Sequence, residues 1–233
     1  MNYREIVQLG RHRLMCGDAT EYEDIEQLLD GQRVNLVLTD PPYGIRVVNE
    51  KTGTIGARGR TRVYAPVIGD TNGDMFTEHY RIIRCLCNRL IVWGGQNFTR
   101  TLPPSCGWLF WDKEKNNDAL TFGDGELAWT NVSTRILKYS HKWNGFTQAG
   151  NKSLNQRVHP TQKPVELHMQ ILEDFTQPGD VILDCFGGSG TTLIACQLTG
   201  RTCYMMDISP DYCDVITNRY KTLTEGTIPF AEG

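Results

Sequence analysis

Residues 180–200 read "DVILDCFGGSGTTLIACQLTG". Residues 180–186 are mainly apolar and predict a buried strand, while residues 190–200 predict a helix that ends at Gly200. The glycine-rich turn between them lets the backbone approach a ligand closely, and the N-terminus of the helix offers free N–H groups. This strand–turn–helix unit predicts an α/β fold with a ligand site at the end of the strand.

The alternation of strand and helix continues along the chain. Further strands are expected at 12–16, 34–39, 89–95, 107–113, 125–130, 134–140 and 202–208, and further helices at 21–29, 75–87, 164–175 and 209–223. The strands 125–130 and 134–140 are expected to form a pair or hairpin, and Thr20 is a candidate cap for the helix at 21–29. The alternation implies a mostly parallel sheet with helices on both faces, in which ligands bind beyond the carboxyl ends of the strands.

The glycine turn narrows the choice of ligand. A P-loop would require a lysine that is absent here, and the dinucleotide pattern G-x-G-x-x-G is met by Gly188 and Gly190 but not by Leu193. The next strand ends in Asp207, and an acid at that place can accept hydrogen bonds from ribose hydroxyls. A glycine turn followed by such an acid fits an adenosine cofactor, either NAD or S-adenosylmethionine.

Two more segments contain side chains of the kinds found in active sites and binding sites. "LTDPPYGI" (38–45) places Asp40, Pro41, Pro42 and Tyr43 at the end of a predicted strand, either as a proline-rich turn or as an active site. "HPTQKP" (159–164) places a lysine and a threonine just before a predicted helix. These two side chains could hold the carboxylate of a methionine moiety, or the lysine could be a basic helix cap.

The size and composition limit the class of protein. A chain of 233 residues fits one α/β domain, with or without a small insert. No apolar stretch approaches the ~18 residues of a membrane span, and the N-terminus lacks an apolar signal region, so we expect a cytoplasmic protein. The eight cysteines form no C-x-x-C pair and no zinc-ligand spacing, so we expect buried thiols in a reducing compartment and no metal site.

The charges are unevenly distributed although the net charge is only −3. No acidic residue occurs from Leu127 to Val165, a stretch that contains six lysines and arginines. A second basic segment, residues 46–62, has four arginines and one lysine against a single acid, Glu50. The two segments suggest a face for a polyanion such as nucleic acid, although two solvated loops would explain the charges equally well.

The chain contains three motifs, which follow one another in the order "DPPY" (40–43), "HPTQKP" (159–164) and "DCFGGSGT" (184–191). In this order they resemble the beta class of amino DNA methyltransferases. The segments "HRLMCGDAT" (12–20), "FWDKE" (110–114), "ELAWT" (126–130) and "SPDYCDVITNRY" (209–220) resemble small members of that family, which are common in phages and prophages. The resemblance covers nearly the whole chain.

The resemblance implies a class I fold of the S-adenosylmethionine-dependent methyltransferases. That fold has seven mostly parallel strands, one of them antiparallel near an edge, with helices on both faces and a circularly permuted motif order. Residues 1–233 would form a single methyltransferase domain. Within it the resemblance implies a catalytic half at 1–112 with a mobile loop at 44–73, a short target-recognition insert at 113–158, and a cofactor-binding half at 159–233.

The family's roles carry over to matching positions. The catalytic residues would be Asp40, Pro41, Pro42 and Tyr43. The residues that would bind S-adenosylmethionine are Asp18, Ala19, Thr161, Lys163, Asp184, Phe186, Gly188, Ser189, Gly190, Thr191 and Asp207. The candidate DNA contacts, drawn from the basic segments, are Arg46, Arg58, Arg60, Arg62, Lys138, Lys142, Lys152 and Arg157.

The expected reaction is methyl transfer from S-adenosylmethionine to N6 of adenine in double-stranded DNA, after the base is flipped out of the helix. Methylation at cytosine C5 needs a nucleophilic cysteine, which the enzymes of that chemistry carry in a Pro-Cys pair. This chain has no Pro-Cys pair, so C5 methylation is disfavoured. In the family that the chain resembles, an aspartate at the first motif position favours adenine as the target base, and cytosine N4 is the alternative. RNA or protein amines are less expected as substrates. The resemblance also implies a place in restriction–modification, a bacterial or phage-infected cell, and a homodimer as one possible assembly.

Overall fold

The computed structural model describes residues 1–43, 54–55, 62–63, 74–114, 123–143, 158–159 and 161–226. A nine-stranded sheet runs through these residues, in the order β1-β2-β11-β10-β3-β6-β8-β7-β9. In chain order its strands are β1 (Ile6–Leu9), β2 (His12–Cys16), β3 (Leu36–Thr39), β6 (Leu90–Trp93), β7 (Gly107–Asp112), β8 (Gly125–Thr130), β9 (Ile136–Ser140), β10 (Val181–Asp184) and β11 (Thr202–Asp207).

The centre of the sheet is parallel. Strands β2, β11, β10, β3 and β6 all run in one direction, whereas β1 and β8 run antiparallel to their neighbours. The C-terminal strands β10 and β11 lie between β2 and β3 from the N-terminal part of the chain. The predicted catalytic and cofactor halves therefore share one sheet.

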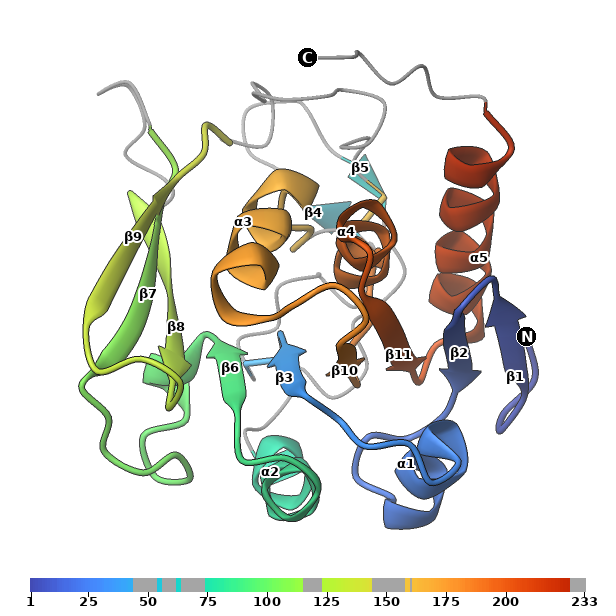
Figure 1. The fold of residues 1–233 in the computed structure, drawn as a ribbon, viewed down its shortest axis with the longest axis horizontal. Helices are drawn as coiled ribbons and strands as arrows, with labels where there is room; N and C mark the ends of the chain where they lie inside the picture. Colours follow the sequence, from blue (N-terminus) through green and yellow to red (C-terminus); the bar gives the residue numbers. More distant parts are fainter. Residues whose placement is uncertain are drawn as a thin grey trace.

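Helices cover both faces of the sheet (Figure 1). The helices α1 and α2 lie on one face, and α3, α4 and α5 on the other. Their bounds are α1 (Tyr22–Leu29), α2 (Asp74–Leu86), α3 (Val165–Phe175), α4 (Thr191–Thr199) and α5 (Pro210–Thr224), with a short 3-10 helix, η1 (Gly95–Asn97), after β6.

The central strands form two cores because successive side chains point to opposite faces. In β3, Leu36 and Leu38 pack in the cluster that contains α3, α4 and α5, whereas Val37 packs in the cluster that contains α1 and α2. In β10, Ile182 and Leu183 divide in the same way. This burial on both faces explains why these strands are continuous apolar runs in the sequence.

The expected count of seven strands is wrong. The additional strands β1 and β9 lie at the two edges of the sheet, and the seven strands between them contain one antiparallel member, β8. Strand β1 was not predicted, since it has only four residues and one of them alone is fully buried.

The expected pairing of 125–130 with 134–140 is also wrong. Strands β8 and β9 lie on opposite sides of β7, antiparallel and parallel to it respectively. Alternating burial in β7 predicts a strand but does not identify which strands lie beside it. Both β8 and β9 belong to the predicted target-recognition insert, so this part of the insert is continuous with the central sheet.

Most helix ends agree with the predictions. Helix α4 ends at Gly200, which has a left-handed φ of 76°, and α5 begins with Pro210 after Ser209. Thr20 does not cap α1, because the residue before that helix is Glu21 and the Thr20 hydroxyl donates to Asp18.

Several other expectations can be compared with the described residues. Six of the eight free cysteines are buried, and Cys85 and Cys106 are exposed. Among these residues, no group of three or more His, Cys, Asp or Glu side chains is placed so that it could hold a metal ion. Of the helices described, none combines the length and the apolar character that crossing a membrane requires.

Most of the predicted loop 44–73 lies outside the described residues. The exceptions are the short strands β4 (Thr54–Ile55) and β5 (Arg62–Val63), which pair with each other.

Candidate functional site

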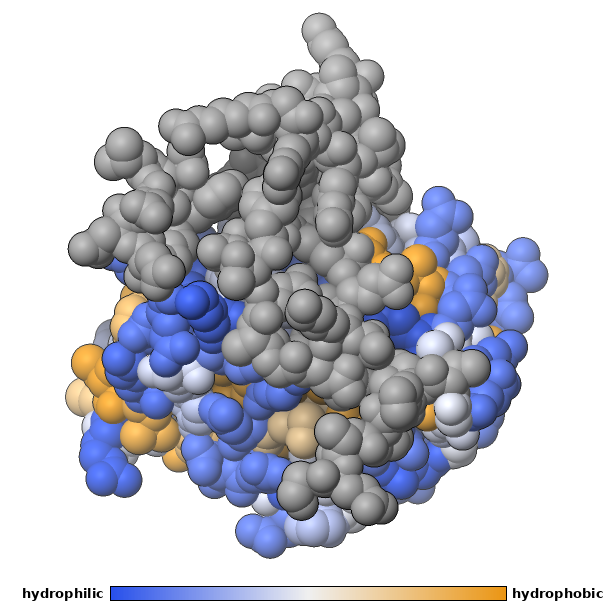
Figure 2. Space-filling view, turned by 90° about the horizontal axis from the view of Figure 1, so that it is seen from above, coloured by the Kyte–Doolittle hydropathy of each residue, from blue (hydrophilic) through white to orange (hydrophobic). Residues whose placement is uncertain are grey.

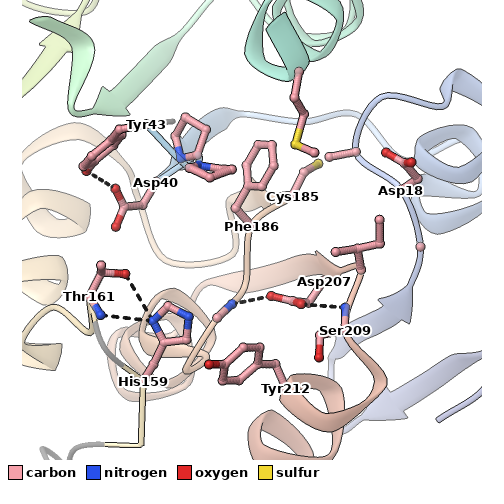
Figure 3. Close-up of a pocket in the computed structure, with 17 residues that line it drawn as sticks. Asp18, Asp40, Tyr43, His159, Thr161, Cys185, Phe186, Asp207, Ser209 and Tyr212 are labelled. Atoms are coloured by element: carbon pink, nitrogen blue, oxygen red, sulfur yellow. Dashed lines mark hydrogen bonds between the residues drawn. The ribbon is translucent and has the colours of Figure 1, made fainter. Parts of the chain in front are cut away.

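A pocket lies where four parallel strands end. The residues that follow β2, β3, β10 and β11 line it, together with side chains from α2, α5 and the segment around His159. The space measures about 780 Å³ including its open mouth. Figure 3 shows Asp40 and Tyr43 at one end, Asp18 at the other, and Phe186 between them.

Asp40 is held by contacts to both of its carboxylate oxygens. The Tyr43 hydroxyl donates to Oδ1, and the Lys163 ammonium contacts Oδ2. The side chain of Asp40 is 20% exposed, so it remains accessible from the pocket that it lines. All four residues of the "DPPY" motif line this pocket.

The ring of Tyr43 rests against Gly94. A Cβ added to Gly94 would overlap the Tyr43 ring atoms Cε1 and Cζ, and the backbone of Gly94 has a φ of +66°. The edge of the ring also meets Phe98, with the ring centroids 6.1 Å apart. A glycine directly after β6 is therefore needed to leave space for the aromatic residue of the motif.

Lys163 is buried and lies between two carboxylates. Its Nζ contacts Asp40 and is 3.3 Å from Oε2 of Glu126 in β8. The other oxygen of Glu126 is 2.5 Å from Nζ of Lys113. Burial would lower the pKa of Lys163, but the charges of Asp40 and Glu126 outweigh burial and raise it. Burial would raise the pKa of Glu126, but the two lysines lower it.

The glycine turn is joined to the acid that ends β11. The amide of Gly188 donates to Oδ2 of Asp207 over 2.7 Å, and the amide of Ser209 donates to Oδ1 over 2.9 Å. Burial raises the pKa of Asp207 to about 6, although these two hydrogen bonds oppose the shift. Gly188 adopts a left-handed φ of 51°, which a glycine allows at low cost.

The loop after β2 forms the far end of the pocket. Oδ1 of Asp18 accepts hydrogen bonds from the amide and hydroxyl of Thr20, at 2.8 and 2.7 Å. The amide of Asp18 donates to the fully buried Asp24 over 2.9 Å. Nδ1 of His79 lies 2.9 Å from the carbonyl oxygen of Ala19, so this nitrogen carries the proton, and burial lowers the pKa of His79 to about 4. The loop is thus fixed by a buried acid and a neutral histidine.

The "HPTQKP" segment contributes His159 and Thr161 to the pocket (Figure 3). The amide of Thr161 donates to Nδ1 of His159 over 3.3 Å, so a neutral His159 carries its proton on Nε2. The ring of Tyr212, from α5, lies edge-on to His159 with centroids 4.6 Å apart.

Six of the eleven residues predicted to bind the cofactor line the pocket: Asp18, Ala19, Thr161, Phe186, Gly188 and Asp207. Lys163, Asp184, Ser189, Gly190 and Thr191 do not line it. The carboxylate of Asp184 accepts hydrogen bonds from the Thr192 hydroxyl and the Phe186 amide, at 2.6 and 3.1 Å, and burial raises its pKa to about 7. Asp184 thus stabilises the glycine turn through hydrogen bonds and does not line the pocket itself.

Other pocket residues were not predicted. These are Gly17, Met75, His159, Cys185, Ile208, Ser209 and Tyr212. Five of them do lie within segments that carry the family resemblance, but no role was assigned to them: Gly17, His159, Cys185, Ser209 and Tyr212. Glu126 and Lys113 lie in the segments "ELAWT" and "FWDKE". The contact of Glu126 with Lys163, and of Lys113 with Glu126, depends on sheet pairing that the sequence did not reveal.

The predicted DNA contacts fall largely outside the described residues. Arg46, Arg58, Arg60, Lys152 and Arg157 lie outside them, and only the backbone of Arg62 is described. Lys138 is exposed on β9 and forms a 2.7 Å ion pair with Asp112, and Lys142 is half-buried. On the face shown in Figure 2, the described residues are mainly hydrophilic, with smaller apolar clusters.

A family model described as DNA methylase, of the N6/N4 methyltransferases, matches residues 92–218, more than half of the chain. This chain belongs to the N6/N4 DNA methylase family. Within it, the chain is 26% identical over 203 residues to the putative methylase YubD of Escherichia coli (strain K12), covering 78% of this chain and 79% of the relative. It is 23% identical over 240 residues to the Type II methyltransferase M.HpaI of Haemophilus parainfluenzae, covering 89% and 73% respectively.

Solved structures share the fold of this DNA methylase. The complex of M1.HpyAVI with SAM superimposes with a TM-score of 0.58 at 19% identity, covering 88% of this chain and 97% of that one. The PvuII DNA methyltransferase, which is cytosine-N4-specific, also has a TM-score of 0.58, at 15% identity and 97% coverage of both chains. A DNA modification methylase of Thermus thermophilus, in complex with S-adenosyl-L-methionine and itself described as putative, has a TM-score of 0.55 at 20% identity and covers 92% of this chain and 95% of that one.

Proposed function

We propose that this methylase transfers a methyl group from S-adenosylmethionine to the exocyclic N6 of adenine in double-stranded DNA. The observation that carries the proposal is the single pocket lining shared by the "DPPY" turn and by the acids Asp18 and Asp207. One end of the pocket thus offers acceptors for an amine, and the other offers acceptors for a nucleoside. Two structural neighbours were solved with S-adenosylmethionine, which supports the choice of cofactor.

The polar groups of the pocket fit this cofactor. Asp207 would accept from the ribose hydroxyls, Asp18 from the adenine amino group, and Phe186 would contact the adenine between them. Thr161 and Gly188 would meet the methionine end. Asp184, Ser189, Gly190 and Thr191 would shape the turn without lining the pocket. When bound, the cofactor supplies an electrophilic methyl group on a positively charged sulfur.

Asp40 and Pro41 would prepare the amine for attack. The carboxylate of Asp40 would accept one hydrogen of the amino group, and the carbonyl of Pro41 would accept the other. An amine held in this way directs its lone pair at the methyl group. The N–C bond would form as the C–S bond breaks, and the electron pair would stay on sulfur in the product S-adenosylhomocysteine. The fixed acceptors would stabilise the positive charge that develops on nitrogen. Asp40, or water next to it, then takes the proton from nitrogen.

Tyr43 would receive the flipped base. Extruding a paired base costs a few kcal/mol, and stacking on an aromatic ring returns roughly 1–3 kcal/mol. The ring of Tyr43 lines the pocket beside Asp40 and is backed by Gly94, so it is fixed before the base arrives.

Incubation of the purified chain with S-adenosylmethionine and unmethylated genomic DNA tests the proposal. Nucleoside mass spectrometry and single-molecule sequencing would identify the modified base and its sequence context. We expect N6-methyladenine in a short motif. N4-methylcytosine would move the assignment to the alternative substrate of the same family, and transfer to RNA or protein but not to DNA would refute the proposal.

A further inference from the structure

A row of alternating charges leads from the pocket to the antiparallel pair β7 and β8. It starts at Asp40 and continues through Lys163 and Glu126 to Lys113. These residues come from three distant parts of the sequence: the end of β3, the antiparallel pair β7 and β8, and the segment before α3. Three of the four lie outside the pocket lining, and only Asp40 lines it.

The ammonium group of Lys163 is buried and has a neighbouring group for each of its N–H bonds. Its side chain is 3% exposed. Three groups surround Nζ, as many as it has N–H bonds: the carboxylate of Asp40, the carboxylate of Glu126 at 3.3 Å, and the ring of Trp93, whose centroid is 4.9 Å away. A lysine held in this way is directed at Asp40, and it is not part of the lining of the pocket in which a cofactor would lie.

We propose that Lys163 and Glu126 are positioning residues of the transfer reaction, which act through Asp40 and not through the cofactor. Lys163 holds one carboxylate oxygen of Asp40 while Tyr43 holds the other, so the carboxylate cannot rotate. Each oxygen keeps a second lone pair for the amino group of the base. The inference rests on the proposed function, since the base is what this carboxylate would receive.

Glu126 has a separate part in this arrangement. With Asp40 as its sole counter-ion, the buried ammonium would bind Asp40 as a tight ion pair and weaken it as a hydrogen-bond acceptor for the base. The second carboxylate shares the charge of Lys163, and Lys113 in turn balances Glu126. The four charges sum to zero, and the effect of removing each one should decrease with its distance along the row from Asp40.

The test is a comparison of turnover with cofactor binding in isosteric variants. We expect Lys163→Met to lower kcat about 100-fold, in the range found when a preorganised electrostatic group is removed. Glu126→Gln should lower kcat only about 10-fold, below that range, because Glu126 acts on Asp40 through Lys163. The dissociation constant for S-adenosylmethionine, measured by calorimetry, should change less than about threefold in both. Lys113→Met should have a smaller effect on kcat than Glu126→Gln.

Controls separate this inference from its alternatives. Glu78→Gln makes the same chemical change in an exposed ion pair with Arg81 on α2 and should leave kcat unchanged. The double variant of Lys163 and Glu126 should lose no more activity than Lys163→Met alone, because both residues act through one carboxylate. If Lys163→Met fails to fold, Glu126→Gln and its cofactor affinity decide the question alone.

Two results would overturn the inference. One is a rise of about tenfold or more in the dissociation constant for S-adenosylmethionine in Lys163→Met with Glu126→Gln unaffected, which would make Lys163 a cofactor contact. The other is wild-type kcat in Glu126→Gln. Absence of transfer by the wild-type chain itself is a different outcome, because it refutes the proposed function and the inference falls with it.

Discussion

At the scale of single residues, the site depends on side chains whose partners are distant in the sequence. Lys163, which orients Asp40, is 123 residues from it in the sequence. Gly188, whose amide donates to Asp207, is 19 residues from it in the sequence. The type of each chemical group could be predicted from the motifs, but its partner could not. The Lys163–Glu126 contact is an example, since it requires the position of strand β8 to be known.

Gly94→Ala should impair catalysis by displacing Tyr43. The added Cβ would overlap the ring that lies beside Asp40, so we expect kcat to fall about tenfold with little change in S-adenosylmethionine affinity. The matched control is Gly31→Ala, because Gly31 also has a left-handed φ, +74°, but a Cβ there meets no atom within 4 Å. Both variants carry about 1–2 kcal/mol of backbone strain. Equal activity of the two variants would contradict the role given to Gly94.

Asp184 should give the stability a specific pH dependence. Its pKa is raised to about 7 by burial, so the folded protein binds this proton more tightly than the unfolded chain. The stabilisation is fully present below the unfolded value near 3.8 and is lost as pH rises through about 7. Asp207, with a pKa of about 6, acts in the same direction, whereas the histidines with lowered pKa act in the opposite one.

Asp184→Asn isolates this contribution, because the other titrating groups are common to both proteins. The amide resembles the protonated carboxyl, so the variant lacks the loss of stability at higher pH. From pH 5 to pH 8, the free energy of unfolding of the variant minus that of the wild type should rise by about 1–3 kcal/mol. Urea unfolding at several pH values measures this difference, and a flat or falling difference would show that Asp184 is ionised throughout.

At the scale of secondary structure elements, the strand ends determine where the chemistry lies. The expectation that ligands bind beyond the carboxyl ends of parallel strands agrees with the pocket, whose lining follows β2, β3, β10 and β11. Elements with strong periodicity or clear caps, such as α4 with Gly200, could be predicted. The positions of β1, β8 and β9 could not, because short strands carry no signal for their neighbours in the sheet.

Arg201 should be the main connection between the ends of two helices. Its guanidinium is buried and donates to the Thr176 carbonyl over 2.8 Å and to the Thr176 hydroxyl over 3.1 Å, after α3, and also to the carbonyl of Thr199 in α4. Arg201→Met would leave these carbonyls without donors and should lower the free energy of unfolding by roughly 2–4 kcal/mol.

Urea unfolding measures this effect. The matched control is Arg33→Met, since Arg33 is exposed and its replacement should change stability by less than about 0.5 kcal/mol. Equal stability of the two variants would show that Arg201 does not hold the ends of α3 and α4 together.

At the scale of the whole molecule, the fold brings two parts of the chain onto one sheet. Strands β10 and β11, which carry the predicted cofactor motifs, lie between β2 and β3 from the N-terminal part. The α/β class and the mostly parallel centre could be predicted from the alternation of apolar segments. The total of nine strands could not, because the short edge strand β1 has no pattern in the sequence that predicts it.

Cofactor binding and catalysis should be separable at Asp40. The most direct measurement compares Asp40→Ala with the wild-type chain in two assays, calorimetric binding of S-adenosylmethionine and transfer of radiolabelled methyl groups to unmethylated DNA. We predict that the dissociation constant stays within about threefold while transfer falls by about 100-fold or more. Retention of transfer, or loss of cofactor binding together with transfer in a folded variant, would contradict the catalytic role of Asp40.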